Sequence, residues 1–230
     1  MRAIFFGASG GLATAVARRL LTRGWFVDLV SRSQKAEAVR GRFAAALTEG
    51  QARLFTVDKE YPEFVPDQSY DAYFFMQALF TPCALAAMEE SRIEAEIAVG
   101  LTSHILLTRK LIAAHPPLPD ERRDFCYIGS TSAYAGFSNT SVYCAVKHGL
   151  LGFVRAMNDE YSKTDVRFWL FSMGTMNTEM GAALVEQDST SFLQPKDVAD
   201  RMIAAITSAS NLFEPEVIMR RRSIRFLERK

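Results

Sequence analysis

The feature that most constrains the fold of this 230-residue chain is a regular alternation of two kinds of segment. Short apolar runs rich in Val, Ile and Phe have the length and composition of buried strands. They cover residues 3–6, 26–30, 53–57, 72–76, 125–128, 166–171 and 216–219. Longer segments with apolar residues at helical spacing lie between them, at 12–23, 35–48, 91–114, 142–161 and 195–207. Strands that alternate with helices pair in parallel, and the helices cover both faces. The sequence therefore predicts an α/β fold with a doubly wound, parallel, seven-stranded sheet.

The longest helical segment, 91–114, carries large apolar side chains at steps of four residues: Ile93, Ile97, Leu101 and Ile105. Two prolines follow it, and the polar stretch 116–124 has the composition of a loop. No internal repeat, low-complexity tract or linker interrupts the chain. Because 230 residues suit one buried core better than two, we expect a single domain over residues 1–230.

Charge and cysteine content exclude several classes of partner. The net charge is +1, so nothing in the overall balance favours nucleic acid. Cys83, Cys126 and Cys144 show no C-x-x-C spacing and predict neither a disulfide framework nor a zinc site. No apolar run reaches the roughly 18 residues of a membrane span, and Gly7 interrupts the first run too early for a signal peptide. We therefore expect a cytoplasmic protein without metal, nucleic-acid or membrane partners.

The segment "FFGASGGLA", residues 5–13, joins the first predicted strand to the first predicted helix and allows two interpretations. As a G-x-S-x-G turn it would present Ser9 as a hydrolase nucleophile, which requires an acid and then a histidine later in the chain. The last histidine is His148, far from the C-terminal end, so hydrolysis is the weaker interpretation. As a glycine-rich turn the segment would receive the phosphates of a dinucleotide.

The phosphate interpretation gives each part of this turn a role. Gly7 and Gly11 let the backbone turn tightly and approach a pyrophosphate, with Ser9 and Gly10 between them. The helix from Leu12 onward presents unpaired N–H groups and the positive end of its dipole. We therefore predict that these five residues bind a dinucleotide cofactor.

A second cofactor contact is predicted at Ser31-Arg32, about 20 residues further on, where the second strand ends. This position reads the adenosine ribose: an acidic residue would bind a free 2′-hydroxyl, whereas an arginine can pair with a 2′-phosphate. Arg32 therefore favours NADP(H) over NAD(H). The alternative is a solvated arginine at a strand end.

A possible catalytic group follows the strand at 125–128, in the segment "GSTSAYAGFSNTSVYCAVK". Tyr143 and Lys147 are four residues apart at the start of a helix, so their side chains share one face. An ammonium close to the phenol, with a positively charged nicotinamide beside it, would favour the phenolate, and lowering the phenol pKa toward 7 needs roughly 4 kcal/mol. Ser130 lies at the carboxyl end of the strand, where ligands gather in parallel sheets. These groups suit carbonyl reduction, with Ser130 holding the oxygen, Tyr143 donating the proton, and Lys147 tuning Tyr143 and binding the nicotinamide ribose.

In these motifs the chain resembles the short-chain dehydrogenase/reductase family. The likeness runs from the turn at 7–11 through Asp58, Ser130 and Tyr143-x-x-x-Lys147 to Met173-Gly174 with Thr178. It implies that Asp58 contacts adenine and that Thr178 helps hold the nicotinamide carboxamide. It also implies a Rossmann-type, seven-stranded sheet and pairing through the helices at 91–114 and 142–161. A homodimer is expected, with a tetramer as the alternative.

The chain departs from the family pattern in four places. Ala13 replaces the third glycine of the turn, and Met173 replaces a proline. Phe75-Met76-Gln77-Ala78 stands where the family has Asn-Asn-Ala-Gly, and Gln77 is a candidate polar contact to the cofactor. Gly100 aligns with the catalytic asparagine and has no side chain to hold a relay water. The departures leave a second function open, an NADP(H)-binding regulatory or structural protein with weak or lost turnover.

The substrate is expected to be a small carbonyl compound or alcohol. In the family the segment matching 178–195 covers the substrate pocket. Here it offers apolar side chains at Met180, Ala182, Ala183, Leu184 and Phe192, near Met173 and Met176. An apolar substrate is the natural prediction, with lid packing as the alternative use of these side chains. The basic tail "RRRSIRFLERK" interleaves apolar and charged residues, as a partly buried final segment would.

Overall fold

The computed structural model describes residues 1–58, 61–118, 121–184, 186–209 and 212–223. Its centre is one parallel sheet in the order β3-β2-β1-β4-β5-β6-β7, which confirms the doubly wound, seven-stranded prediction. Each predicted strand run corresponds to one strand of this sheet. The strands are β1 Arg2–Phe6, β2 Phe26–Arg32, β3 Ala52–Val57, β4 Ala72–Phe75, β5 Arg123–Ile128, β6 Val166–Met173 and β7 Glu216–Met219.

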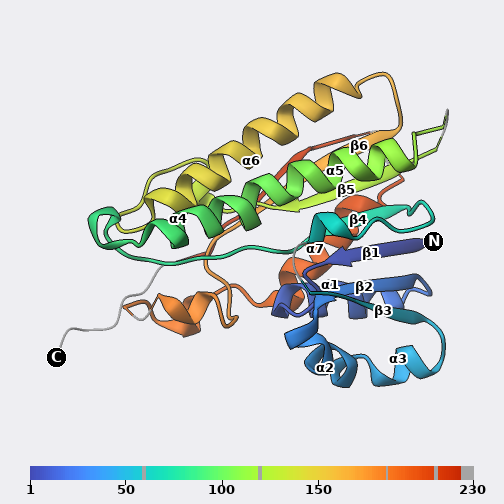
Figure 1. Cartoon of the computed structure of the whole chain (residues 1–230), viewed down its shortest axis with the longest axis horizontal. Coiled ribbons are helices and arrows are strands. Elements are labelled where there is room, and N and C mark those ends of the chain that lie inside the picture. Colours follow the sequence, from blue (N-terminus) through green and yellow to red (C-terminus); the bar gives the residue numbers. More distant parts are fainter. Residues whose placement is uncertain (59–60, 119–120, 185, 210–211, 224–230) are drawn as a thin grey trace.

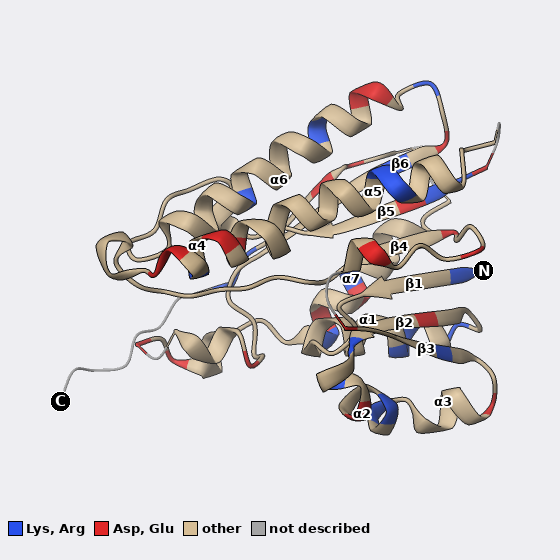
Figure 2. Cartoon of the chain, in the orientation of Figure 1, with Lys and Arg blue, Asp and Glu red and all other residues tan. Residues whose placement is uncertain are grey.

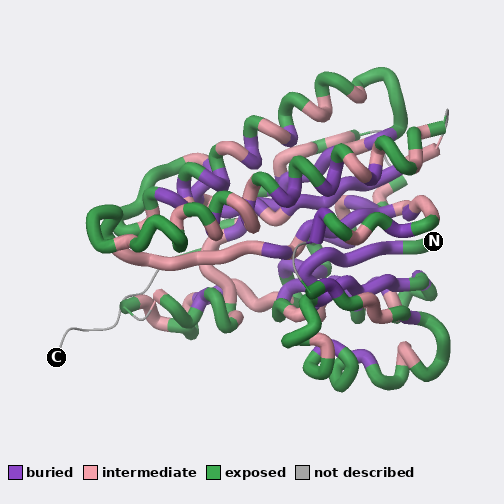
Figure 3. The backbone as a smooth tube through the Cα atoms, viewed as in Figure 1, coloured by how far each residue is buried: buried purple, intermediate pink, exposed green. Residues whose placement is uncertain are grey.

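Helices cover both faces of the sheet (Figure 1). The helices α1 Gly11–Leu21 and α7 Pro195–Thr207 pack together on one face, near α2 Ser33–Arg42 and α3 Ala44–Thr48. On the other face lie α4 Glu90–Ile97, α5 Ser103–Ala114 and α6 Ser141–Glu160. Two apolar cores result, one on each side of the sheet, and Figure 3 shows the central strands as the most continuously buried part of the chain.

The alternation of side chains along a strand explains how one sheet serves two cores. Phe5 and Phe6 are both fully buried, yet they belong to opposite cores. Phe5 stacks on Phe74 with ring centroids 4.4 Å apart, and Phe6 lies 5.6 Å from Phe75. Strands buried on both faces are apolar at every position, which is why β1 and β4 read as uninterrupted apolar runs.

Two predicted segments differ in the structure: the helix expected at 35–48 is divided into α2 and α3, and the loop expected at 116–124 ends earlier, because β5 begins at Arg123. Arg123 and Asp124 are both buried in the strand. Arg123 forms an ion pair with Glu121 at 2.6 Å, and Asp124 forms one with Arg167 at 2.6 Å. Paired charges can be buried in a sheet, and sequence composition alone cannot show which charges will find partners.

The long helix predicted at 91–114 is present but contains a π-helical segment, Ala98–Thr102, between α4 and α5. The buried face of the helix combines Gly100, Ser103 and His104 with the large apolar Leu107 and Leu111. The isoleucine stripe faces outward: Ile97 is 40% and Ile105 38% exposed. By length and a mean hydropathy of 1.3 this helix could cross a membrane, although a third of that window is buried against the sheet.

Two glycines let this long helix and α6 approach each other closely. A Cβ on Gly100 would lie 2.6 Å from Cγ1 of Val146, and one on Gly149 would lie 2.9 Å from Cδ2 of Leu101. Both distances are shorter than any stable carbon–carbon contact. The glycine at position 100 is therefore explained by packing against α6.

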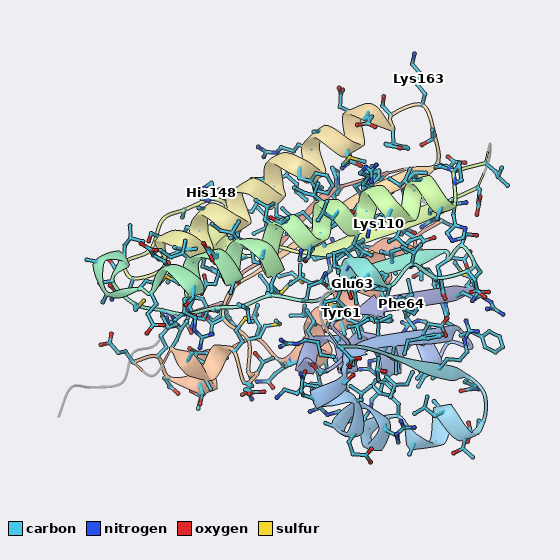
Figure 4. All side chains as sticks on the ribbon, viewed as in Figure 1. Tyr61, Glu63, Phe64, Lys110, His148 and Lys163 are labelled. Atoms are coloured by element: carbon cyan, nitrogen blue, oxygen red, sulfur yellow. The ribbon has the colours of Figure 1, made fainter. Side chains whose placement is uncertain are left out.

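Contacts in the C-terminal half of α5 connect this helix layer to the edge of the sheet. Lys110 on α5 donates from Nζ to the carbonyl oxygen of Pro62 at 2.7 Å, beside Tyr61 and Glu63 (Figure 4). The Phe64 ring lies 5.0 Å from that of Phe55 on β3. Through residues 61–64, these contacts connect α5 to the edge strand β3.

Candidate active site

A cleft of about 1420 Å³ lies at the carboxyl ends of the strands. Its walls come from the turn after β1, the segments after β4, β5, β6 and β7, the start of α6, and part of the predicted lid. Pockets for one drug-sized ligand measure roughly 300–1,000 Å³. The cleft is therefore large enough for a dinucleotide and a second small molecule.

The glycine-rich turn forms one wall of this cleft with Gly7, Ser9, Gly10, Gly11 and Leu12. Gly7 has φ +86°, and a Cβ there would lie 2.8 Å from the backbone nitrogen of Gln77. Only glycine fits such a conformation and such a contact. Gly10 precedes α1 without a side-chain cap, so the first N–H groups of the helix face the cleft without a side-chain partner. These features fit the pyrophosphate of a dinucleotide.

The predicted ribose site is only partly assembled by the structure. Arg32 ends β2 and lines the cleft with an exposed side chain. Ser31 is fully buried and is not among the lining residues, and its hydroxyl donates to the carbonyl oxygen of Arg32 at 3.2 Å. Asp58 also lies outside the lining and accepts a hydrogen bond from Ser33 at the start of α2. Cofactor contacts by Ser31 and Asp58 remain predictions.

Two further cations border this site, and sequence reasoning missed both. Lys35 and Arg42 on α2 line the cleft, and Figure 2 shows the basic residues of this helix as blue segments of its ribbon. Arg42 donates from Nη1 to the carbonyl oxygen of Ser9, within the phosphate turn. Among the described residues neither cation forms an ion pair with a carboxylate. Arg42 lies 33 positions from Ser9, so no local motif connects them.

Gln77 and Thr178 complete the cofactor side of the cleft. The Gln77 side chain is buried, with Nε2 3.5 Å from the Ser103 hydroxyl and Oε1 without a hydrogen-bond partner among the described residues. Thr178 faces the turn, because a Cβ on Gly11 would lie 3.3 Å from its methyl group. An unpaired buried amide oxygen beside a cleft is typical of a group that binds a ligand.

Ser130, Tyr143 and Lys147 come together on the opposite wall of the cleft. Ser130 follows β5 by two residues, and its hydroxyl accepts from the backbone N–H of Ser132 at 3.1 Å, which fixes the turn. Tyr143 and Lys147 lie one turn apart on α6, with the Lys147 Nζ 5.4 Å from the centroid of the Tyr143 ring. The phenol ring also meets the edge of Phe80, whose ring centroid is 4.8 Å away.

The protein groups around Tyr143 favour its protonated phenol, whereas the lowered pKa expected from the sequence also requires a positively charged nicotinamide beside it. Burial raises the pKa of Tyr143 to about 12, the Ser130 side chain opposes the rise, and the charge of Glu96 adds to it. Lys147 is 1% exposed and donates from Nζ to the carbonyl oxygen of Ile128 at 2.8 Å. Burial lowers the pKa of Lys147 to about 8. The arrangement holds a proton on the tyrosine oxygen, as a proton donor requires.

Two further titratable side chains, Glu96 and His104, are buried near enough to Tyr143 and Lys147 for their charges to interact. Glu96 is 2% exposed on α4, and burial raises the pKa of its carboxyl while the neighbouring Thr81 opposes the rise. His104 is fully buried between Phe75 and Tyr127, and burial, aided by the charge of Lys147, lowers its pKa to about 3. A single charged residue in a helix carries no sequence signal that it faces a site.

The predicted lid at 178–195 contributes much of the remaining wall, although Val185 lies outside the described residues. Met180, Ala183 and Leu184 line the cleft with Met173 and Met176, whereas Ala182 and Phe192 do not.

Of the basic tail, residues 224–230 lie outside the described residues. Among the described residues no group of three or more His, Cys, Asp or Glu side chains could hold a metal ion. His148 lies on the outer side of α6 and takes no part in the cleft (Figure 4).

Comparison with known proteins relates this arrangement to a large group of enzymes. The family model described as short chain dehydrogenase matches residues 2–189. The 3-oxoacyl-[acyl-carrier-protein] reductase MabA of Mycobacterium avium is 29% identical over 79% of this chain and 69% of its own length. Carbonyl reductase family member 4 of Xenopus tropicalis is 25% identical over 88% of this chain and 89% of its own.

Solved structures share the fold over nearly the whole chain. A metagenomic short-chain oxidoreductase in complex with NADP superimposes with a TM-score of 0.76 at 24% identity, covering 97% of this chain and 98% of its own. ElxO with NADP bound superimposes with a TM-score of 0.80 at 15% identity, covering 95% and 96%. Sequence match and shared fold agree with the motifs that line the cleft, and the protein is a member of the short-chain dehydrogenase/reductase family of oxidoreductases.

Proposed function

We propose that the protein is an NADP(H)-dependent oxidoreductase that reduces the carbonyl of a small substrate, or oxidises the corresponding alcohol. The observation that carries the proposal is the shared cleft. Ser130, Tyr143 and Lys147 form one wall, and the glycine-rich phosphate turn at 7–11 forms another. A cofactor seated on the turn would lie beside the proton donor.

The three side chains have separate roles in this reaction. Ser130 would donate a hydrogen bond to the substrate oxygen and hold it beside the phenol. Tyr143, protonated because burial raises its pKa, would give its proton to that oxygen as negative charge develops. Lys147, already fixed by the carbonyl of Ile128, would bind the ribose of the cofactor and stabilise the phenolate left behind. The nicotinamide, when bound, supplies the hydride.

The preference for NADP(H) is supported by the charges around Arg32. Arg32, Lys35 and Arg42 line the same end of the cleft, and none of them forms an ion pair within the described part of the chain. Guanidinium groups bind phosphate oxygens with two directed hydrogen bonds. NADP is also the cofactor named for two of the solved structures that share the fold.

The substrate class is proposed from the walls and the relatives. Met173, Met176 and Leu184 give the cleft apolar surface near the catalytic groups. The relatives include reductases of 3-oxoacyl chains and carbonyl compounds, so a 3-oxoacyl compound is the first probe to test. We further propose a cytoplasmic homodimer formed through α4, α5 and α6, where Ile97, Ile105 and Leu106 are 38–42% exposed.

The second candidate function is a cofactor-binding protein with little turnover. Gly100 favours it, because no side chain extends from this position to order a water for proton supply. The complete set of Ser130, Tyr143 and Lys147 favours the enzyme, since binding alone does not require a proton donor.

Calorimetric titration with NADP⁺ and NAD⁺ is the first experiment, followed by NADPH oxidation with the neutral thioester acetoacetyl-N-acetylcysteamine. Tyr143→Phe should keep its affinity for NADP⁺ and lose roughly 100-fold or more in kcat. Tyr134→Phe is the matched control, because this cleft-lining phenol donates its hydrogen bond to Glu216 on β7. Binding without turnover of any 3-oxoacyl probe would support the second candidate, and absence of binding to both cofactors would refute the proposal.

A further inference from the structure

Two arginines enter the cleft directly after the last strand. β7 ends at Met219, and Arg220 and Arg221 line the cleft beyond it. Arg221 packs against Gly174, the residue after β6: a Cβ on this glycine would lie 3.7 Å from Cγ, Nε and the backbone nitrogen of Arg221. Arg221 is thus placed beside the cleft wall that continues into the lid.

The guanidinium of Arg221 is held by the lid. Its Cζ lies 5.6 Å from the ring centroid of Phe192, which is 6% exposed. Its Nη1 donates to the Ser191 hydroxyl at 3.4 Å. A cation stacked on a buried ring and anchored by one hydrogen bond has a fixed position. Within the described residues this is its one side-chain hydrogen bond, and it uses one of the five N–H donors of a guanidinium.

Neither arginine has a counter-charge in the described part of the chain. No carboxylate there lies within 4.0 Å of Arg220 or Arg221, although Glu179 and Glu186 line the same cleft. On β7 itself, by contrast, Glu216 pairs with Arg155 at 2.6 Å.

Burial of Arg221 has an electrostatic consequence. Arg221 is half-buried, and burial lowers its pKa. A partly buried guanidinium without a carboxylate is unfavourable by itself, and an anionic ligand would offset that cost.

We propose that Arg221, with Arg220 beside it, binds an anionic group of the substrate, a phosphate or a carboxylate that lies away from the reacting carbonyl. The substrate is then a carbonyl compound with an apolar body, which contacts Met173, Met176 and Leu184, and a charged end, which contacts the arginines. The reaction in this inference rests on the proposed function. The binding of an anion rests on the surroundings of Arg221 alone.

The test uses two pairs of probes that share a reacting carbonyl and differ in charge. Acetoacetyl-coenzyme A and acetoacetyl-N-acetylcysteamine test a phosphate, and 5-oxohexanoate and its methyl ester test a carboxylate. KM and kcat are measured for the wild type, Arg221→Gln and Arg221→Lys. Arg222→Gln is the matched control, because Arg222 is the exposed neighbour and is not a lining residue. Inorganic pyrophosphate is titrated separately into each protein after saturation with NADP⁺, so that the cofactor site is filled.

The expected result is a lower KM for the charged member of one pair, which identifies the anion. Arg221→Gln should raise that KM tenfold or more with kcat unchanged, and should leave the neutral probe unaffected. The KM of Arg221→Lys for the charged probe should lie between those of the wild type and Arg221→Gln. The KM of Arg222→Gln should equal that of the wild type. Equal KM values for the charged and neutral members of both pairs would overturn the inference. An equal rise in KM for both members of a pair in Arg221→Gln would also overturn it, and so would weaker NADP⁺ binding by that variant.

Failure of the proposed function would look different. If no probe is reduced but pyrophosphate binds the NADP⁺-saturated wild type and not Arg221→Gln, the anion site stands and the proposed reduction falls. If no probe is reduced and the wild type does not bind pyrophosphate, the anion site is refuted too.

Discussion

Replacing Gly100 by alanine would place a methyl group inside the contact between the long helix and α6. The new carbon would lie 2.6 Å from Cγ1 of Val146, whereas carbon atoms rest about 3.5–4.0 Å apart. Val146 is 3% exposed and is enclosed by its neighbours, so it cannot simply turn away. The two helices must separate by a fraction of an ångström, or Val146 must leave its preferred rotamer.

The size of the effect follows from two opposing contributions. Overpacking of a buried contact costs about 1–3 kcal/mol. Alanine is favoured over glycine within a helix by about 1 kcal/mol. Gly100→Ala should therefore lower the free energy of unfolding by about 1 kcal/mol, with a range from about 0 to 2. In a Val146→Ala background the clash disappears, and the same substitution should stabilise the protein by about 1 kcal/mol.

Urea unfolding of the wild type, both single variants and the double variant forms a double-mutant cycle. The interaction energy should favour the double variant by about 1–3 kcal/mol, the cost of the relieved clash. Gly152→Ala on α6 is the control, because nothing lies within 4 Å of its Cβ position, and it should be neutral or stabilising. Additivity of the two single variants within about 0.5 kcal/mol would refute the packing explanation for Gly100.

Two further predictions concern charge. The pKa of His104 is lowered to about 3, so between that pH and its ordinary value near 6.5 the unfolded chain binds the extra proton, and stability falls as the solution is acidified. His104→Gln should remove up to about 1.4 kcal/mol per pH unit from the slope of unfolding free energy between pH 4 and 6, and an unchanged slope would contradict the assignment. Arg42→Gln should weaken NADP⁺ binding roughly tenfold and leave NAD⁺ binding unchanged, because only the 2′-phosphate gains from the extra cation. Arg40→Gln, which removes a cation paired with Glu37 and outside the lining residues, is the control in the same titrations, and equal losses for both cofactors would contradict a role at the 2′-phosphate.

The fold could be predicted from sequence because the central strands are buried on both faces and therefore consist of consecutive apolar residues. The strand at 216–219 and the helix at 195–207 have the predicted bounds. The prediction was wrong at Arg123 and Asp124, where the charges are neutralised by Glu121 in the preceding loop and by Arg167 on β6. It also missed the π-helical segment at Ala98–Thr102, which changes hydrogen bonding along the helix and leaves the apolar pattern intact.

The candidate site could be predicted where spacing within one element brings residues together. Tyr143 and Lys147 share a face of α6, and the turn at 7–11 follows directly from the end of β1. Arg42 and Arg221 reach the cleft from the end of α2 and the end of β7, and their neighbours there are distant in sequence. The pKa of Tyr143 could not be predicted either, because burial dominates it and the amount of burial depends on the whole fold.

The closeness of Gly7 to the end of β4 determines which positions can change as such proteins diverge. The atoms nearest to the Gly7 Cβ position are backbone atoms, the nitrogen of Gln77 at 2.8 Å and the carbonyl carbon of Met76 at 3.1 Å. Every residue has these atoms, so the contact constrains Gly7 and leaves the side chains at 76 and 77 free to vary. The glycine is thus required by the fold whatever side chains follow β4, and the sequence Phe75-Met76-Gln77-Ala78, where the family pattern has Asn-Asn-Ala-Gly, is compatible with the same turn.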